Sequence, residues 1–290
     1  MPSTKTAFGS VSRSGSASGS VSFSIAKADK IEGMARGMAV LESFDTQRQP
    51  LNATLAAERA GITRAAARRH LLTLTHLGYL ETDGSYFWLA AKVLRFSGSY
   101  LATARLPCAV QPILNRLAVQ TGNSFSVVVL DRDEVVIVAR SGFGWMGASG
   151  DKAVSARVLA YGLHLGARLP AHATSTGRVL LAAKPKAQFK SWLKIRTDGG
   201  GLPRLTLHTV TDPRKLTALV NQARLDDYCV ASEEHEFGVN ALAVPLRDVR
   251  GRTVAALNVV TSPQRLPIEG LRHDLLPVLL NAARELRPLL

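Results

Sequence analysis

The sequence has few of the residues that build disulfide frameworks, metal sites or membrane spans. Its 290 residues include only two cysteines, Cys108 and Cys229, which lie far apart and form no CxxC pair. No apolar run approaches the ~18 residues typical of a spanning helix, and the N-terminus has no apolar core of a secretory signal. We therefore expect a cytoplasmic protein without membrane contact, with two free thiols in a reducing compartment.

Catalytic signatures are also scarce. The chain contains no GxSxG elbow, no Walker loop and no HExxH pair. Its single GxGxxG pattern, residues 142–147, is not followed by a helix and an acidic residue about 20 positions later, so we interpret it as a loop. No histidine has a recognisable nucleophile partner, His172 being the best placed for ligand contact, and Glu233-Glu234 is interpreted as a polar pair at a strand end. We predict no enzyme, no cofactor and no metal site.

What the sequence has in excess is positive charge. It carries 36 Lys and Arg against 22 Asp and Glu, a net charge of +14 and a pI of about 10.4. This balance favours a polyanionic partner such as nucleic acid. The charge is spread along the chain, +6 over residues 1–105 and +8 over residues 106–290, so the position of particular arginines carries more weight than the total. The length fits about two domains.

The N-terminal region divides into a tail and a helix. Residues 1–28 are rich in serine and glycine with few large apolar side chains, which predicts a disordered tail. The pattern of Ile31 to Phe44 predicts an amphipathic helix. We expect this helix to pack under the two helices that follow it.

Two short helices joined by a tight turn are predicted after Gln49-Pro50. Thr54 is expected to cap the first helix and Thr63 the second, because a hydroxyl accepts hydrogen bonds from the free amides of a first turn. Gly61 is expected in the turn, because glycine enters the left-handed backbone region at no steric cost.

A hairpin follows the second helix. Residues 79–89 alternate around Asp83-Gly84, which is typical of a two-residue hairpin turn. Helix, turn, helix and hairpin in this order predict a winged helix-turn-helix domain over residues 29–89, a module that binds double-stranded DNA.

The second helix of this module separates apolar from basic residues. Ala67, Leu71 and Leu74 recur at the spacing of a buried stripe. Arg64 lies in the first turn, where the helix dipole disfavours a cation, yet guanidinium donors there suit phosphate or a guanine edge. A solvated basic face is the alternative interpretation. The predicted DNA-binding residues are Thr63, Arg64, Ala65, Arg68 and Arg69.

The remaining chain predicts a linker and an α+β domain. Residues 90–105 are expected to form a linker helix, interrupted near Gly98, whose apolar surface suits pairing with a second copy; Pro107 marks its end. Residues 106–290 combine helices with mostly hairpin-linked strands. The expected strands are 125–130, 135–139, 154–159, 163–165, 228–232, 241–247 and 253–260, and the expected helices are 109–120, 174–183, 186–195, 213–226 and 268–286.

Four segments are distinctive in combination: ITRAAARRHLLTLTHLGYLETDG, ARLPAHATSTGRVLLA, EEHEFGVNALAVPLRD and GRTVAALNVV. Together they resemble the IclR family of bacterial transcriptional regulators, over nearly all of the chain from about Ile31. The segments TRAAARR and FWL are most similar to the PcaR/PobR branch, whose members regulate the catabolism of aromatic acids. The resemblance implies a winged helix-turn-helix domain, a linker helix and a GAF-like effector-binding domain, in a dimer or tetramer that binds operator DNA and a small carboxylate.

The resemblance also implies where the effector binds. Physical chemistry supports an anion site at Thr174–Gly177, because a helix that opens with Thr-Ser-Thr-Gly offers free amides and hydroxyls, although a simple helix cap is an equal alternative. Ala231 and Ala241 stand where relatives with small-acid effectors carry polar groups, which leaves room for a ring. The expected effector-binding residues are Val158, Tyr161, Leu169, Ser175, Thr176, Gly177, Val239, Ala241, Asn258 and Val260.

The sequence therefore predicts a cytoplasmic, ligand-responsive regulator of aromatic-acid catabolism, with an effector such as 4-hydroxybenzoate or protocatechuate. The carboxylate is expected at the amides of residues 175–177 and a ring hydroxyl at Asn258. Arg178 is expected either to help neutralise the ligand or to be solvated. Two alternatives stay open: a regulator of the same family that senses a non-aromatic carboxylate, and a metabolite-binding protein or enzyme in which the basic helix is incidental.

Overall fold

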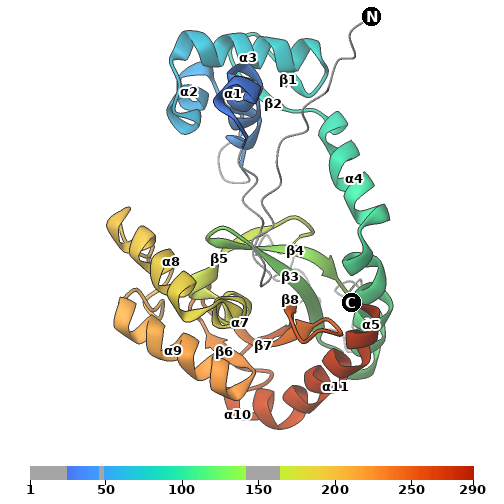
Figure 1. Ribbon diagram of the computed structural model, residues 1–290. Coiled ribbons are helices and arrows are strands. Elements are labelled where there is room, and N and C mark those ends of the chain that lie inside the picture. Colours follow the sequence, from blue (N-terminus) through green and yellow to red (C-terminus); the bar gives the residue numbers. More distant parts are fainter. Residues whose placement is uncertain (1–24, 46–48, 142–163) are drawn as a thin grey trace, which may run out of the picture. The chain divides into compact units, whose positions relative to one another are not determined.

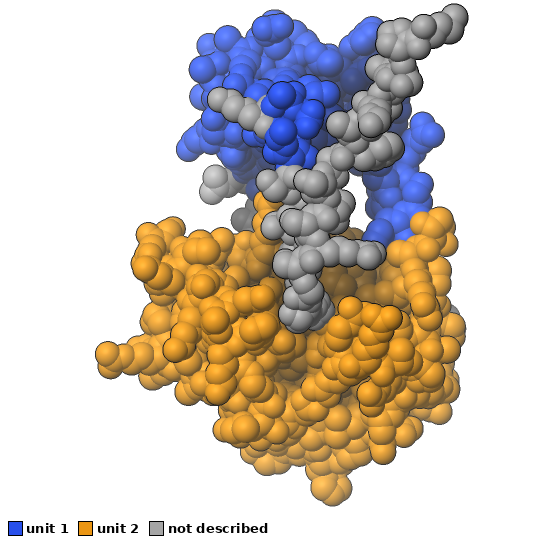
Figure 2. All heavy atoms as spheres, viewed as in Figure 1, with its two compact units in different colours: residues 1–16, 20–100 blue, residues 17–19, 101–290 orange. Residues whose placement is uncertain are grey.

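The computed structural model describes residues 25–45, 49–141 and 164–290 (Figure 1). The chain divides into two compact units, one that ends at Tyr100 and one that runs from Leu101 to Leu290 (Figure 2). The expected tail up to residue 24, the glycine pattern at 142–147 and the expected strand 154–159 lie outside the described residues. Among the helices that the structure describes, none is long and apolar enough to cross a membrane.

The first unit is a three-helix module. A 3-10 turn, η1 (Lys27–Asp29), precedes α1 (Glu32–Glu42), and α2 (Ala53–Ala60) and α3 (Arg64–His76) follow. The three helices pack on one another around a small apolar core (Figure 1). This core consists of Val40, Phe44, Leu51, Ala56, Ala57, Ala67, Leu71, Leu80 and Phe87.

Side chains at the helix ends explain where α2 and α3 begin. The predicted cap Thr54 is wrong: Asn52 Oδ1 accepts hydrogen bonds from the amides of Thr54 and Leu55, each at 3.0 Å, so α2 begins one residue before Thr54. The predicted cap Thr63 is confirmed, since its hydroxyl accepts from the Ala66 amide at 3.3 Å. Gly61 has φ +63°, which confirms the predicted left-handed turn.

The wing is a short antiparallel hairpin of β1 (Leu80–Thr82) and β2 (Phe87–Leu89). The predicted two-residue turn is wrong, because four residues, 83–86, connect the strands. Asp83 closes this loop: its carboxylate accepts the amides of Ser85 and Tyr86 at 2.9 and 2.7 Å. An Asx-type turn therefore replaces the tighter turn that an Asp-Gly pair suggested.

Helices continue into the second unit. After a 3-10 turn, η2 (Ala91–Val93), come α4 (Leu94–Thr103) and α5 (Arg105–Thr121). The predicted interruption near Gly98 is wrong, since α4 runs through it. The break lies at Ala104, and Pro107 falls within the first turn of α5, where its missing N–H has no intrahelical acceptor to lose.

The second unit is built on a six-stranded antiparallel sheet in the order β5-β4-β3-β8-β7-β6. Its fold class is α+β, as predicted. No strand forms at the described residues 164 and 165, and the edge strand is β5, three residues further on. The bounds are β3 (Ser124–Asp131), β4 (Glu134–Arg140), β5 (Arg168–Pro170), β6 (Cys229–Ser232), β7 (Asn240–Arg247) and β8 (Thr253–Thr261).

Helices cover both faces of this sheet, and each face has its own apolar core (Figure 1). On one face lie α5 and the C-terminal helix, made of α10 (Ile268–Gly270), a π-helical turn (Leu271–Leu275) and α11 (Leu276–Leu286). A final 3-10 turn, η6, covers Arg287–Leu289. On the other face lie η4 (Ala171–Ala173), α7 (Ser175–Ala183), α8 (Lys186–Asp198) and α9 (Pro213–Asp226). The two layers leave α7 packed directly on β7 and β8.

Candidate functional site

Helix α3 presents its N-terminal half to solvent. Ala67 and Leu71 are fully buried, which orients the helix, and all five residues predicted to contact DNA are exposed. Within the described residues, no ion pair or hydrogen bond engages the guanidinium group of Arg64, Arg68 or Arg69. These three arginine side chains pair with no carboxylate among the described residues, so they are available to bind a polyanion such as DNA.

A second candidate site begins at the first turn of α7. Thr174 caps the helix by accepting the Gly177 amide at 3.1 Å. Gly177 packs so closely on Ala171 that a methyl group there would collide with the Ala171 backbone. The Gly177 amide is therefore committed to the cap, whereas the amides of Ser175 and Thr176 have no acceptor among the described residues. These two amides, at the positive end of the helix dipole, are open to an anion.

The Ser175 side chain strengthens this assignment. Ser175 is 1% exposed, and its hydroxyl has no hydrogen-bond partner among the described residues. A buried hydroxyl without a partner costs roughly 1–3 kcal/mol, so native structures usually provide a partner from the protein, water or a ligand. Here the hydroxyl lines a cavity, so the missing partner fits a ligand oxygen.

This cavity, called here the α7 cavity, lies between the start of α7, the β3, β4, β7 and β8 strands and the segment 234–239. It brings together seven of the ten residues expected to bind an effector. Gly177 does not line it, and Val158 and Tyr161 lie outside the described residues. The seven are Leu169, Ser175, Thr176, Val239, Ala241, Asn258 and Val260.

Sequence reasoning missed several residues of the same cavity. Ser126 and Val128 come from β3 and Ile137 from β4, in a register that pairs Ser126 with Asn258 across the sheet. Ser126 and Val128 are two positions apart on β3, so the sequence predicts that they lie on the same face of the sheet. Nothing local shows that this face is the one under α7. Glu236 also lines the cavity, and the pattern EEHEFG did not distinguish it from its neighbours.

Asn258 and Ser126 form a polar pair on the floor of the α7 cavity. The Ser126 hydroxyl donates to Asn258 Oδ1 at 2.8 Å, and both residues are buried. This bond uses the amide oxygen of Asn258 and leaves its amide nitrogen as a donor, for which the described residues supply no acceptor. The floor therefore offers a hydrogen-bond donor to a ligand.

Arg178 is buried, so the expectation that it is solvated is wrong, and its guanidinium is paired within the protein. It is 1% exposed and forms a two-pronged ion pair with Glu234, with Nη1 to Oε1 at 2.6 Å and a second contact from Nη2 to Oε2. Its Nε donates to the His172 carbonyl at 3.0 Å. Glu234 also accepts the Val210 amide at 3.1 Å. The positive charge of Arg178 is therefore neutralised by Glu234 inside the protein.

Burial shifts the pKa values of the remaining titratable groups near the α7 cavity in the direction of their neutral forms. Burial lowers the pKa of His235 and of His172, which favours neutral imidazoles. His235 lines the α7 cavity, whereas His172, predicted to be the histidine best placed for ligand contact, does not. Burial raises the pKa of Glu236, whose carboxyl has no hydrogen-bond or ion-pair partner among the described residues.

The chemistry available is binding rather than catalysis. Two amides, one hydroxyl and one amide nitrogen donate hydrogen bonds, and apolar side chains form the walls. No group of three His, Cys, Asp or Glu side chains placed to hold a metal ion occurs in the part of the chain that the structure describes. Cys108 and Cys229 are both free, and burial raises the pKa of the Cys229 thiol to about 11, so it is protonated and unreactive.

Comparison with known families decides the identity of both modules. Residues 33–84 match the IclR helix-turn-helix domain, and residues 98–287 match the family described as Bacterial transcriptional regulator IclR C-terminal. The chain belongs to the IclR family. It is a DNA-binding transcriptional regulator of this family, which consists of regulators rather than enzymes.

Individual relatives are similar over most of the chain. The p-hydroxybenzoate hydroxylase transcriptional activator of Acinetobacter baylyi is 48% identical over 90% of this chain and 92% of its own length. The Pca operon regulatory protein of the same organism is 48% identical over 90% of each chain. A structure of the inducer-binding domain of Acinetobacter PobR, a double mutant in complex with 3-hydroxybenzoic acid, is 42% identical with a TM-score of 0.56 and covers 63% of this chain and 98% of that one.

The Arg178–Glu234 pair yields a stability prediction. Glu234→Gln leaves the buried guanidinium without its counter-charge, and breaking a buried pair in this way should lower the free energy of unfolding of the second unit by about 3 kcal/mol. Glu233→Gln is the matched control, because Glu233 is less buried and Gln retains an oxygen that can accept the Gly238 amide. Urea unfolding followed by circular dichroism measures both, and equal midpoints for the two variants would contradict the prediction.

Proposed function

We propose that this regulator senses a hydroxylated aromatic acid in the α7 cavity and controls genes for the catabolism of such acids in the cytoplasm. The observation that carries the proposal is the buried Ser175 hydroxyl, which has no partner within the described part of the chain and lies beside two amides at a helix N-terminus that also have none there. A ligand carboxylate satisfies all three donors at once. Because Arg178 is paired with Glu234, the anion is held by dipoles and hydroxyl groups rather than by a full charge.

The walls of the α7 cavity suit a ring. Leu169, Val239 and Val260 supply apolar surface, and the short side chain of Ala241 lies in the same wall. The expectation of a ring agrees with two relatives, a p-hydroxybenzoate hydroxylase transcriptional activator and a PobR inducer-binding domain in complex with 3-hydroxybenzoic acid.

Two groups suit a ring hydroxyl. The Asn258 amide nitrogen donates, and the Glu236 carboxyl, which has no partner among the described residues, accepts. An ionised Glu236 repels a nearby carboxylate, so the ligand is expected to direct a hydroxyl toward it. A small non-aromatic carboxylate, the alternative effector, would satisfy the donors at α7 and leave both the apolar wall and Glu236 unmatched.

Effector binding acts through a population shift. The acid stabilises one of two arrangements of the protein to the extent that it binds that arrangement more tightly, and DNA affinity follows this difference.

Removing the Ser175 hydroxyl should weaken binding of acids. Ser175→Ala should reduce the affinity for 4-hydroxybenzoate and protocatechuate about tenfold, because a hydrogen bond to a charged group contributes about 1.5–3 kcal/mol. The methyl esters should lose less. Thr261→Val is the control, since Thr261 also buries a hydroxyl without a partner among the described residues but does not line the α7 cavity. Ala241→Phe should abolish binding of both acids by filling the cavity.

Calorimetry with the two acids and their methyl esters measures these effects. Equal binding of acid and ester by the wild-type protein would place the carboxylate elsewhere. Unchanged affinity in Ala241→Phe would place the ligand outside the α7 cavity. Acetate or pyruvate that binds more tightly than 4-hydroxybenzoate would favour the non-aromatic alternative.

On the DNA side, we propose that α3 enters the major groove. The residues proposed to contact bases or phosphates are Thr63, Arg64, Ala65, Arg68 and Arg69.

Alanine at a base-reading arginine should cost ~1–3 kcal/mol of binding free energy and relax specificity. Alanine at a phosphate contact should weaken binding to all DNA sequences and reduce the salt slope by about one. Arg214→Ala removes the same charge from the exposed start of α9 and should leave DNA affinity unchanged. Binding to the upstream DNA of the target genes, titrated at several salt concentrations, measures this; an unchanged affinity of the triple alanine variant at Arg64, Arg68 and Arg69 would show that another surface binds DNA.

We also propose that the chain is at least a dimer through the linker helix. Exposed apolar side chains lie on two helices of the first unit, on α1 (Met34 and Met38) and on α4 (Leu94, Phe96 and Tyr100). Monomers rarely expose so much apolar surface without a partner, and paired readers reach two half-sites about one helical turn apart.

The linker helix can be tested by charge insertion. Leu94→Glu should shift the sedimentation of the protein from a multiple of 31.1 kDa toward the monomer, because Leu94 is 64% exposed in the single chain and a carboxylate would resist burial. Val249→Glu is the control, at 66% exposure in the turn between β7 and β8. A wild-type protein that sediments as a monomer at micromolar concentration would contradict the proposal.

A further inference from the structure

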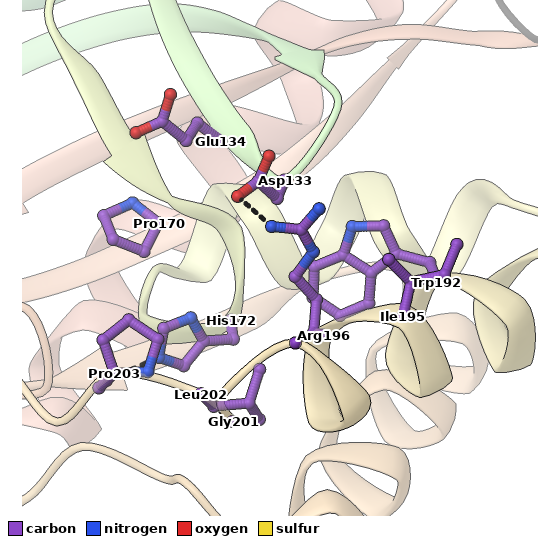
Figure 3. Close-up of a pocket in the computed structure, with 11 residues that line it drawn as sticks. Asp133, Glu134, Pro170, His172, Trp192, Ile195, Arg196, Gly201, Leu202 and Pro203 are labelled. Atoms are coloured by element: carbon purple, nitrogen blue, oxygen red, sulfur yellow. Dashed lines mark hydrogen bonds and ion pairs between the residues drawn. The ribbon is translucent and has the colours of Figure 1, made fainter. Parts of the chain in front are cut away.

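A larger cavity, called here the α8 cavity, lies between α8, the turn that joins β3 to β4, and η4 (Figure 3). Its volume is about 480 Å³, within the roughly 300–1,000 Å³ of small-molecule sites. It shares no lining residue with the α7 cavity. The established and proposed roles of the protein make no use of it.

One wall of the α8 cavity is the indole ring of Trp192, which other contacts hold in one orientation. The indole of Trp192 stacks on Phe189, with ring centroids 6.1 Å apart and planes 18° apart, and its Nε1 donates to the Arg132 carbonyl at 3.1 Å. These two contacts hold the ring in place before any ligand arrives, so little conformational freedom is lost when a ligand stacks on it. Ile195 adds apolar surface from the same helix (Figure 3).

Beside Trp192, one turn further along α8, the lining of the α8 cavity is polar, and its hydrogen-bonding groups are only partly paired among the described residues (Figure 3). Arg196 Nη1 donates to Asp133 Oδ2 at 2.6 Å. Arg196 Nε is buried without an acceptor among the described residues, and Nη2 has none there either. The second oxygen of Asp133 likewise has no donor in the described chain. Hydrogen-bond donors of Arg196 and an acceptor oxygen of Asp133 therefore lie side by side, and neither group has all its partners among the described residues.

His172 adds a second acceptor. Its Nε2 lies 2.9 Å from the Pro203 carbonyl, and because a carbonyl can only accept, this nitrogen carries the proton. The other ring nitrogen, Nδ1, then keeps its lone pair. The imidazole is 3% exposed, so it offers this lone pair in a fixed orientation.

The charges around the α8 cavity already cancel. Asp133 pairs with Arg196, and Glu134 pairs with Arg168 at 2.6 Å. An anionic ligand would lie beside the Asp133 carboxylate, and a cationic ligand would lie beside the Arg196 guanidinium. A neutral ligand avoids both penalties, because hydroxyl groups donate to Asp133 and His172 and accept from Arg196.

We propose that the α8 cavity binds a neutral cyclic polyol, such as a pyranose sugar, with the ring against Trp192 and the hydroxyl groups between Asp133, Arg196 and His172. The two cavities of the second unit then differ in kind: the α7 cavity takes an anion, and the α8 cavity takes an uncharged ring. A polyol and an aromatic acid bind at the same time.

Ligand-observed saturation-transfer NMR on the full chain tests this, with D-glucose and myo-inositol as neutral probes. D-glucuronate and D-glucosamine carry a negative and a positive charge on the same ring and should give weaker transfer than D-glucose. Trp192→Ala should lower the affinity for the neutral probes about tenfold, as expected for loss of an aromatic contact. Trp88→Ala, in the wing, is the matched control and should bind as the wild type does.

Asp133→Ala provides a variant that leaves the core intact, because the Asp133 side chain is partly exposed at a turn; it should also weaken binding several-fold. The proposal is overturned if neither neutral probe contacts the wild-type protein up to millimolar concentration. It is equally overturned if Trp192→Ala and Asp133→Ala bind D-glucose as the wild type does, if D-glucuronate or D-glucosamine binds more tightly than D-glucose, or if 4-hydroxybenzoate displaces D-glucose.

Discussion

The second unit depends on one buried ion pair, between Arg178 on α7 and Glu234 after β6. The two residues are 56 positions apart, and both are removed from water, so the pair is stable only when its geometry is complete. Completion requires the backbone as well, because Arg178 also donates to the His172 carbonyl and Glu234 accepts the Val210 amide. One interaction therefore fixes η4, α7, the segment before α9 and the start of the β6–β7 connection.

The same pair determines how the α7 cavity treats an anion. If Arg178 reached the cavity, its full charge would hold any carboxylate tightly and with little regard for the rest of the molecule. In the proposed complex, Arg178 stays paired with Glu234 and the anion meets two amides and the Ser175 hydroxyl. Under this proposal the charge of the ligand contributes modestly, and discrimination between ligands rests on the ring and its hydroxyl.

Sequence reasoning was strongest where the signal is local and weakest where it is not. The periodicity of Ala67 and Leu71, the φ of Gly61 and the Thr63 cap follow from residues within one turn, and all are confirmed. Asn52 was overlooked because Thr54 and Asn52 are both good caps, and only the path of the chain decides between them. The role of Arg178 could not be predicted, because its partner is distant in sequence and no local pattern distinguishes a buried arginine from a solvated one.

The helical connection between the two units bears on how a signal could pass. The boundary between the units falls inside α4, between Tyr100 and Leu101, so it crosses a hydrogen-bonded helix rather than a loop. A helix transmits displacement along its length, whereas a loop absorbs it. Only Ala104, with φ −69° and ψ 124°, is non-helical between α4 and α5. Ala104 therefore separates two α-helices, α4 and α5, that are each continuous on their own side of it.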